Sequence, residues 1–143
     1  MLTKAISILS LVTLLVSCNS QKSGEKQSSL ANCYSYASGG DTVTLKIIHV
    51  GESITGGLVY NFKEKDKNKG TILGTMSGDV LVADYTFISE DIQSVRQVAF
   101  KLEGDHFVEG YGDTFITNDK VRFKNIDSLH FNTGMKLEEI PCR

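Results

Sequence analysis

The residues of this sequence with the clearest chemical potential are three charged side chains, Arg96, Glu109 and Asp113. Each falls on the apolar phase of a predicted β-strand. A charge on a buried face is costly unless it is paired or hydrogen-bonded. The three groups therefore form either an ion pair that holds one end of the domain together or the polar anchor of a ligand cavity.

A ligand cavity also needs apolar walls, because pockets are mostly apolar with a few placed polar groups. Aromatic residues of the predicted strands share the phase of Arg96 and Glu109 and supply such walls: Tyr60, Tyr85, Phe100 and Tyr111. A small barrel can equally fill its interior with these side chains. The sequence leaves both interpretations open.

Other chemistry is poorly represented. The sequence has no nucleophile motif and no paired carboxylates at a recognisable catalytic spacing, so we expect a protein that is not an enzyme. His49, His106 and His130 are scattered without metal-ligand spacing, and we expect no metal and no cofactor. The net charge of −2 argues against nucleic-acid binding, which needs a basic surface.

Three hairpin turns must position these residues. Each has glycine at the first central position of a two-residue turn, which suits a type II′ hairpin. They are Gly51-Glu52, Gly78-Asp79 and Gly104-Asp105. Each turn fixes a register that lines up apolar residues which the turn itself did not select, and this agreement indicates an all-β fold. The predicted same-face pairs include Leu45–Leu58, Ile72–Tyr85, Phe100–Glu109, Val98–Tyr111 and Arg96–Asp113.

The remaining strands carry weaker signals. Tyr34–Ala37 and Met135–Cys142 are predicted as the first and last strands, and Phe115–Phe123 as a further hairpin. A two-residue turn there would put Arg122 on the apolar face, so we expect a longer loop or a bulge. Eight or nine strands in sequential antiparallel order predict an up-and-down meander that closes into a small barrel, with a two-sheet sandwich as the alternative.

The first residues have a different character. Lys4 precedes an apolar run that is shorter than the about 20 residues needed to cross a bilayer, and the run ends in Leu15-Val16-Ser17-Cys18. This pattern resembles the lipobox of bacterial lipoproteins. The resemblance implies a signal peptide over residues 1–17, with lipid and acyl (palmitate-type) chains on Cys18. Residues 18–31 are polar and are expected to be a flexible tether before a barrel domain over 32–143.

The lipoprotein resemblance also implies a location. Asn19 and the residues after it lack the acidic signals for surface export and the aspartate that retains lipoproteins in the inner membrane of enteric bacteria. This favours anchoring in an outer membrane, facing the periplasm. With Cys18 lipidated in an oxidising compartment, Cys33 and Cys142 remain as an even pair, which predicts a disulfide between the two ends of the domain.

By strand pattern the domain resembles the small calycin-like barrels, a group that includes lipocalins and avidins. Typical members carry a tryptophan near the first strand, and this chain has no tryptophan, so no functional residue is carried over from them. The sequence therefore predicts a non-enzymatic, lipid-anchored envelope protein that binds a small apolar ligand or an envelope partner. The alternative is a structural or protein-interaction lipoprotein with a filled barrel, and an envelope enzyme ranks below both.

Overall fold

Ten β-strands make up most of residues 31–143, the part of the chain that the computed structural model describes. They are β1 (Ala31–Ser38), β2 (Asp41–Val50), β3 (Ser53–Asn61), β4 (Asn68–Ser77), β5 (Val80–Ser89), β6 (Ile92–Glu103), β7 (His106–Tyr111), β8 (Thr114–Thr117), β9 (Lys120–Phe123) and β10 (His130–Ile140). A 3₁₀ turn at Ile126–Ser128 precedes β10. Within this range no helix is both long and apolar enough to cross a bilayer. The expected signal peptide and Cys18 lie outside the described residues.

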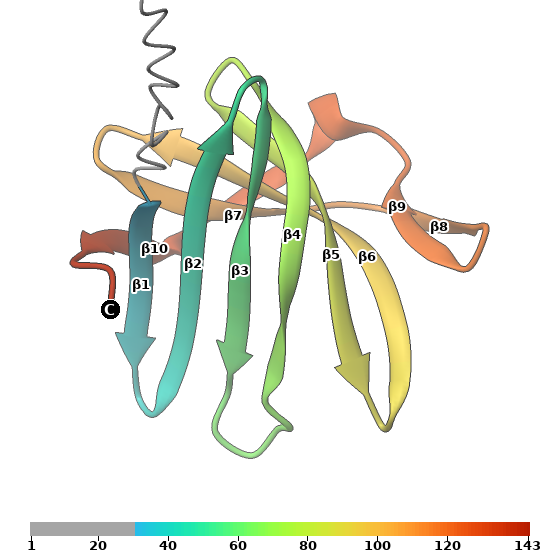
Figure 1. The fold of residues 1–143 in the computed structure, drawn as a ribbon, viewed down its shortest axis with the longest axis horizontal. Helices are drawn as coiled ribbons and strands as arrows, with labels where there is room; N and C mark the ends of the chain where they lie inside the picture. The colour runs from blue at the N-terminus through green and yellow to red at the C-terminus, as the bar shows by residue number, and fades with distance from the viewer. Residues whose placement is uncertain (1–30) are drawn as a thin grey trace, which may run out of the picture.

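Eight of these strands close into a barrel (Figure 1). The strands β1 to β7 follow one another around the wall, and β10 fills the remaining place between β7 and β1. The pairing of β5 with β6 closes the ring, and all eight neighbours run antiparallel. The barrel thus confirms the predicted meander and replaces the sandwich alternative. The strands β8 and β9 lie outside this ring.

The three glycine turns set the predicted registers. Gly51, Gly78 and Gly104 have φ values of 61°, 62° and 67°, the left-handed region that glycine adopts without steric cost. Leu45 pairs with Leu58, and Ile72 with Tyr85, as the turns require. The pairing of Phe100 with Glu109 also holds.

The interior of the barrel is filled with apolar side chains through most of its length. Its largest fully buried members come from strands all around the wall: Leu45, Ile54, Leu58, Ile72, Leu81, Tyr85, Phe100 and Leu137. One glycine makes room for this packing, because a Cβ atom at Gly70 would lie 2.8 Å from Cε2 of Tyr85 and 2.0 Å from the carbonyl oxygen of Thr86. The Tyr85 ring therefore lies across β4, as expected for glycine placed beside an aromatic residue.

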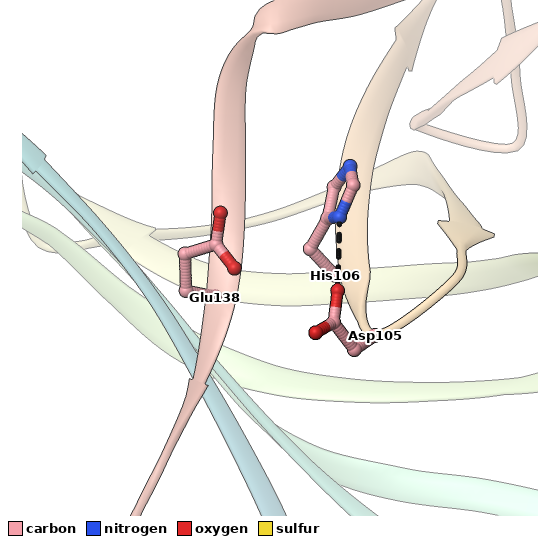
Figure 2. A group of neighbouring side chains, drawn as sticks. All are labelled: Asp105, His106 and Glu138. Carbon is pink, nitrogen blue, oxygen red and sulfur yellow. Dashed lines mark hydrogen bonds and ion pairs between the residues drawn. The ribbon is translucent and has the colours of Figure 1, made fainter.

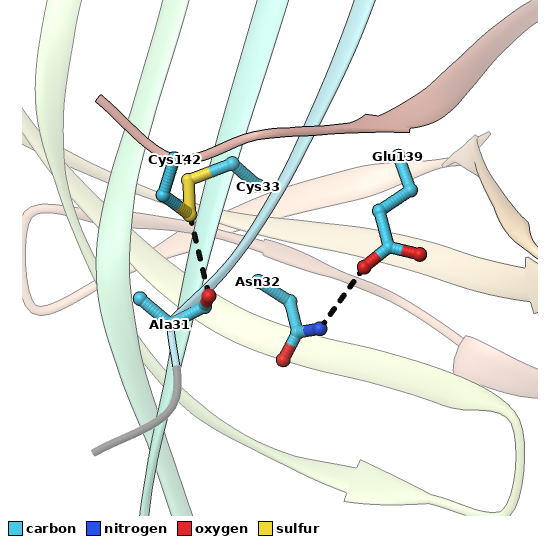
Figure 3. Close-up of a disulfide and its surroundings, with 5 residues drawn as sticks. All are labelled: Ala31, Asn32, Cys33, Glu139 and Cys142. Atoms are coloured by element: carbon cyan, nitrogen blue, oxygen red, sulfur yellow. Dashed lines mark hydrogen bonds between the residues drawn. A yellow bond between two sulfur atoms is a disulfide. The ribbon is translucent and has the colours of Figure 1, made fainter. Parts of the chain in front are cut away.

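A disulfide joins the two ends of the domain (Figure 3). Cys33 on β1 and Cys142, just after β10, are bonded with their Cα atoms 5.2 Å apart, although they are separated by 109 positions in the sequence. Nearby, the Asn32 side chain donates a hydrogen bond of 3.2 Å to Glu139 across the same seam. The predicted bridge is confirmed, and it fastens the pair of strands that closes the chain on itself.

The hairpin of β6 and β7 keeps its predicted register but is shorter than predicted. The pairing of β6 with β7 runs from Glu103–His106 to Ala99–Gly110 and stops there. Beyond that point β9 takes the place of β7 and pairs with β6 in parallel, with Arg96 next to Val121. The predicted pairs Val98–Tyr111 and Arg96–Asp113 were therefore wrong, because β7 leaves β6 before it reaches them.

The hairpin of β8 and β9, which we call the outer hairpin, also corrects a prediction. Asn118 and Asp119 have φ values of 48° and 59° and form a two-residue turn between Thr117 and Lys120, with no longer loop or bulge. Positive φ at both positions is the type I′ pattern, which asparagine and aspartate tolerate. The expected conflict with Arg122 does not arise, because this hairpin lies outside the barrel and its faces need not follow the core.

Candidate functional site

A cavity of about 310 Å³ lies at the place where β7 separates from β6. Its walls come from β3, β6, β7 and the outer hairpin. The lining residues are Tyr60, Phe62, Arg96, Gln97, Val98, Glu109, Gly110, Tyr111, Gly112, Thr114, Val121 and Phe123. We call this cavity the barrel mouth.

Glu109 is the buried polar centre of the barrel mouth, with 4% of its surface exposed. One carboxylate oxygen accepts a short hydrogen bond from the Tyr60 hydroxyl, and the other accepts one of 2.7 Å from the Tyr111 hydroxyl. The two donors thus come from different strands, Tyr60 from β3 and Tyr111 from β7, which also carries Glu109. These bonds satisfy a carboxylate that would otherwise be costly to bury.

Burial governs the proton affinity of this cluster. The pKa of Glu109 is raised, because the loss of solvent around the carboxylate outweighs the two tyrosine hydrogen bonds and the Arg96 charge, which lower it. Burial also raises the pKa values of Tyr60 and Tyr111, and the neighbouring Glu109 adds to both increases. For Tyr85 burial raises the pKa to about 12. Tyr60 and Tyr111 therefore stay protonated at neutral pH and can donate to Glu109.

Arg96 lies over aromatic rings instead of pairing with an acid. Its guanidinium carbon is 5.0 Å from the ring centre of Tyr60, 5.5 Å from Tyr85 and 5.6 Å from Phe87. Such cation–π contacts stabilise the charge at this distance. Within residues 31–143 Arg96 makes no hydrogen bond or ion pair, and its buried Nε has no acceptor. The guanidinium is thus held in position with its donors unused.

The barrel mouth brings together most of the residues predicted from the sequence. Its lining includes Arg96, Glu109, Tyr60 and Tyr111. The ring of Tyr85 contacts the Arg96 guanidinium. Three predicted residues are not part of the lining: Tyr85, Phe100 and Asp113. Phe100 is fully buried in the core beside Glu109.

Asp113 lies away from the barrel mouth. Its side chain is 86% exposed and contacts Lys124 at 3.8 Å. This position follows from the early separation of β7 from β6, which carries Asp113 out to the surface.

Sequence reasoning missed the wall that the outer hairpin supplies. Thr114, Val121 and Phe123 line the barrel mouth from β8 and β9. The hairpin is held there by Gln97, whose side-chain oxygen accepts a hydrogen bond of 3.1 Å from the Phe123 amide. The alternation of apolar residues near Phe123 was visible, but a parallel pairing has no turn to reveal its partner strand.

A second polar cluster lies at the turn that joins β6 to β7 (Figure 2). This turn is at the other end of the hairpin from the barrel mouth. Donor atoms of Asp105, His106 and Glu138 lie within 4.8 Å of one another, and His106 Nδ1 is 3.4 Å from Asp105. Sequence spacing could not reveal this group, because His106 and Glu138 are cross-strand partners on β7 and β10. Both carboxylates are exposed, and solvent satisfies such groups without an ion.

A larger hollow of about 650 Å³ lies on the outer face of the barrel near the disulfide. It is lined by Cys33, Thr44, Lys46, Gly57, Val59, Lys69, Ile140, Pro141 and Arg143. Its polar groups are long, solvated surface side chains, and none of them is buried like Glu109. The smaller barrel mouth is therefore the better candidate site, because Glu109 is buried there and is held by hydrogen bonds from Tyr60 and Tyr111.

Comparisons with known proteins add no assignment. No family model matches the chain, and neither a curated protein nor a solved structure matches it.

Proposed function

We propose that this chain is a non-enzymatic, lipid-anchored protein of the bacterial cell envelope that binds a small, largely apolar ligand at the barrel mouth. The observation that carries the binding function is the convergence of Arg96 and Glu109 on a cavity walled by aromatic side chains. Pockets of this composition, with an apolar lining and a few oriented polar groups, are typical of small-molecule sites.

The arrangement of Glu109 favours binding over catalysis. Both of its oxygens accept tyrosine hydrogen bonds, which fix the carboxylate and leave it poorly placed to remove a proton from a substrate. The filled interior limits the ligand to the end of the barrel at which Tyr60 and Arg96 lie.

Denaturing mass spectrometry of the protein purified from its source cells tests the binding proposal, since a bound compound should be released. A thermal-shift screen of small molecules should then find compounds that raise the melting temperature. Thr114→Trp should abolish the shift by filling the barrel mouth. Thr117→Trp, on the same strand but outside the lining, should preserve it. A screen without a single stabilising compound would contradict the proposal.

The anchoring proposal rests on the lipobox resemblance at Leu15-Val16-Ser17-Cys18 and has its own test. We expect the mature chain to begin at Cys18 and to carry a mass increase from covalent lipid. Membrane fractionation should place it in the outer membrane, facing the periplasm. Cys18→Ala should release it from membranes, and a membrane-bound, unmodified Cys18→Ala chain would exclude lipid as the anchor.

One observation favours a partner-binding function as the second candidate. The outer hairpin projects from the barrel and exposes Phe115 and Ile116. Exposed apolar groups on a projecting element fit contact with an envelope protein. In that case the double variant Phe115→Ser/Ile116→Ser should lose an in-cell crosslink between this chain and the envelope protein. The thermal shift caused by small molecules should be unchanged.

A further inference from the structure

We propose that the barrel mouth selects a compact organic anion, a carboxylate on a short, flat apolar body, with the Arg96 guanidinium as its anchor. This inference rests on the proposed binding function and names its ligand class.

Arg96 is held in position without an acceptor among the described residues. Three aromatic rings hold its guanidinium in place, and no acceptor within residues 31–143 uses its donors. Arginine presents its N–H groups in a planar fork that matches a carboxylate. Because the side chain is already positioned, a ligand would not have to pay for ordering it.

The neighbouring acid, Glu109, does not serve as the acceptor for Arg96. Glu109 and Arg96 share the barrel mouth but form no ion pair, and both oxygens of Glu109 are engaged by Tyr60 and Tyr111. These hydrogen bonds disperse its charge, and burial favours its neutral form. Both effects reduce the repulsion that an incoming anion would meet.

The cavity also limits the size and shape of the ligand. The cavity of about 310 Å³ is at the small end of ligand pockets. Tyr85, Phe100 and Leu58 are fully buried in the filled barrel, so a long acyl chain has no room to extend inward. The aromatic walls of Tyr60 and Phe62 suit a flat ring or a short alicyclic body instead.

Isothermal titration calorimetry of the purified full chain with benzoate, benzamide and dodecanoate tests this inference. Benzamide has the shape of benzoate without its charge. We expect benzoate to bind at least about ten-fold more tightly than benzamide, the effect of one charge-assisted hydrogen-bond pair. Dodecanoate should bind no more tightly than benzoate.

Arg96→Met should remove the preference for benzoate and leave benzamide binding nearly unchanged. Methionine keeps an unbranched apolar stem beside the aromatic rings, so the barrel should still fold. Arg143→Met, the same change at an exposed position near the end of the chain, is the matched control and should keep the preference.

The outcomes separate the inference from the function on which it rests. Equal affinity for benzoate and benzamide, or an unaltered preference in Arg96→Met, overturns the anion inference. Benzoate that fails to bind while neutral compounds from the thermal-shift screen do bind overturns it as well. Tighter binding of dodecanoate overturns the limit on ligand length, and a screen with no binder at all overturns the proposed function itself.

Discussion

The two sides of the barrel differ in how their strands pair. From β1 to β5 each strand pairs along its length with the next strand of the sequence. On the other side β6 divides its edge between β7 and β9. The first side faces a filled apolar interior, and the second side opens at the barrel mouth, where Arg96 and Glu109 lie. Continuous pairing thus accompanies the core, whereas interrupted pairing leaves room for polar groups.

The largest expected effect on stability comes from the disulfide that joins β1 to the end of β10. Cys33→Ser/Cys142→Ser removes a cross-link that spans 109 positions, and the chain-entropy model predicts a loss of about 4–5 kcal/mol in the free energy of unfolding. Urea denaturation measures this loss. Reduction of the unaltered chain should reproduce it, and a loss below about 1 kcal/mol would show that the β1–β10 seam holds without the bond.

A pair of alanine variants compares the core with the outer hairpin. Leu45→Ala removes a fully buried side chain on β2 and should cost about 3 kcal/mol through lost burial and a cavity. Ile116→Ala on β8, where 75% of the side chain is exposed, should stay within about 0.5 kcal/mol. Equal losses in urea denaturation would mean that the outer hairpin packs as tightly as the barrel.

The acid in the barrel mouth should make stability depend on pH. Because folding raises the pKa of Glu109, the unfolded chain releases this proton near the ordinary value of about 4.5, while the folded chain retains it. The contribution of Glu109 to the free energy of unfolding is therefore complete below about pH 4.5. It is lost as the pH rises through the pKa that Glu109 has in the folded chain. Relative to Glu109→Gln, the unaltered chain should lose stability over that range in urea denaturation, and parallel pH curves would contradict the raised pKa.

The smallest effect concerns the attachment of the outer hairpin. Asp84 on β5 contacts Lys120 at 3.3 Å and Arg122 at 3.2 Å, and both ion pairs are partly exposed. Asp84→Asn should cost about 0.5 kcal/mol and speed hydrogen exchange in β9. Asp113→Asn, whose partner contact is long and exposed, should leave that exchange unchanged. Equal exchange in both variants would show that backbone pairing alone holds the hairpin.

The sequence predicted the continuously paired strands better than the region where β6 pairs with both β7 and β9. Gly51, Gly78 and Gly104 each define a turn, and a turn determines the register of the strands beside it. This local information sufficed for Leu45–Leu58, Ile72–Tyr85 and Phe100–Glu109. It also placed Tyr60, Arg96 and Glu109 on one inner face, so the main residues of the barrel mouth were found.

Local information failed where strands far apart in sequence compete for one edge. Nothing near Arg96 signals that Val121 will replace Asp113 beside it. Gly110 is a second case, because a Cβ atom there would lie 2.7 Å from the ring of Phe131 on β10, so the missing side chain makes room for this ring. Such close contacts depend on the assembled barrel, and a single hairpin pattern does not contain them.

The seam between β1 and β10 has a mechanical consequence. A pulling force applied between Ala31 and Arg143 would pass from the first residues of β1 directly through the bond between Cys33 and Cys142. The strands between these cysteines form a covalent loop outside that load path. The oxidised barrel would therefore keep its shape under tension at its two ends, whereas reduction of one bond would expose every strand to the force.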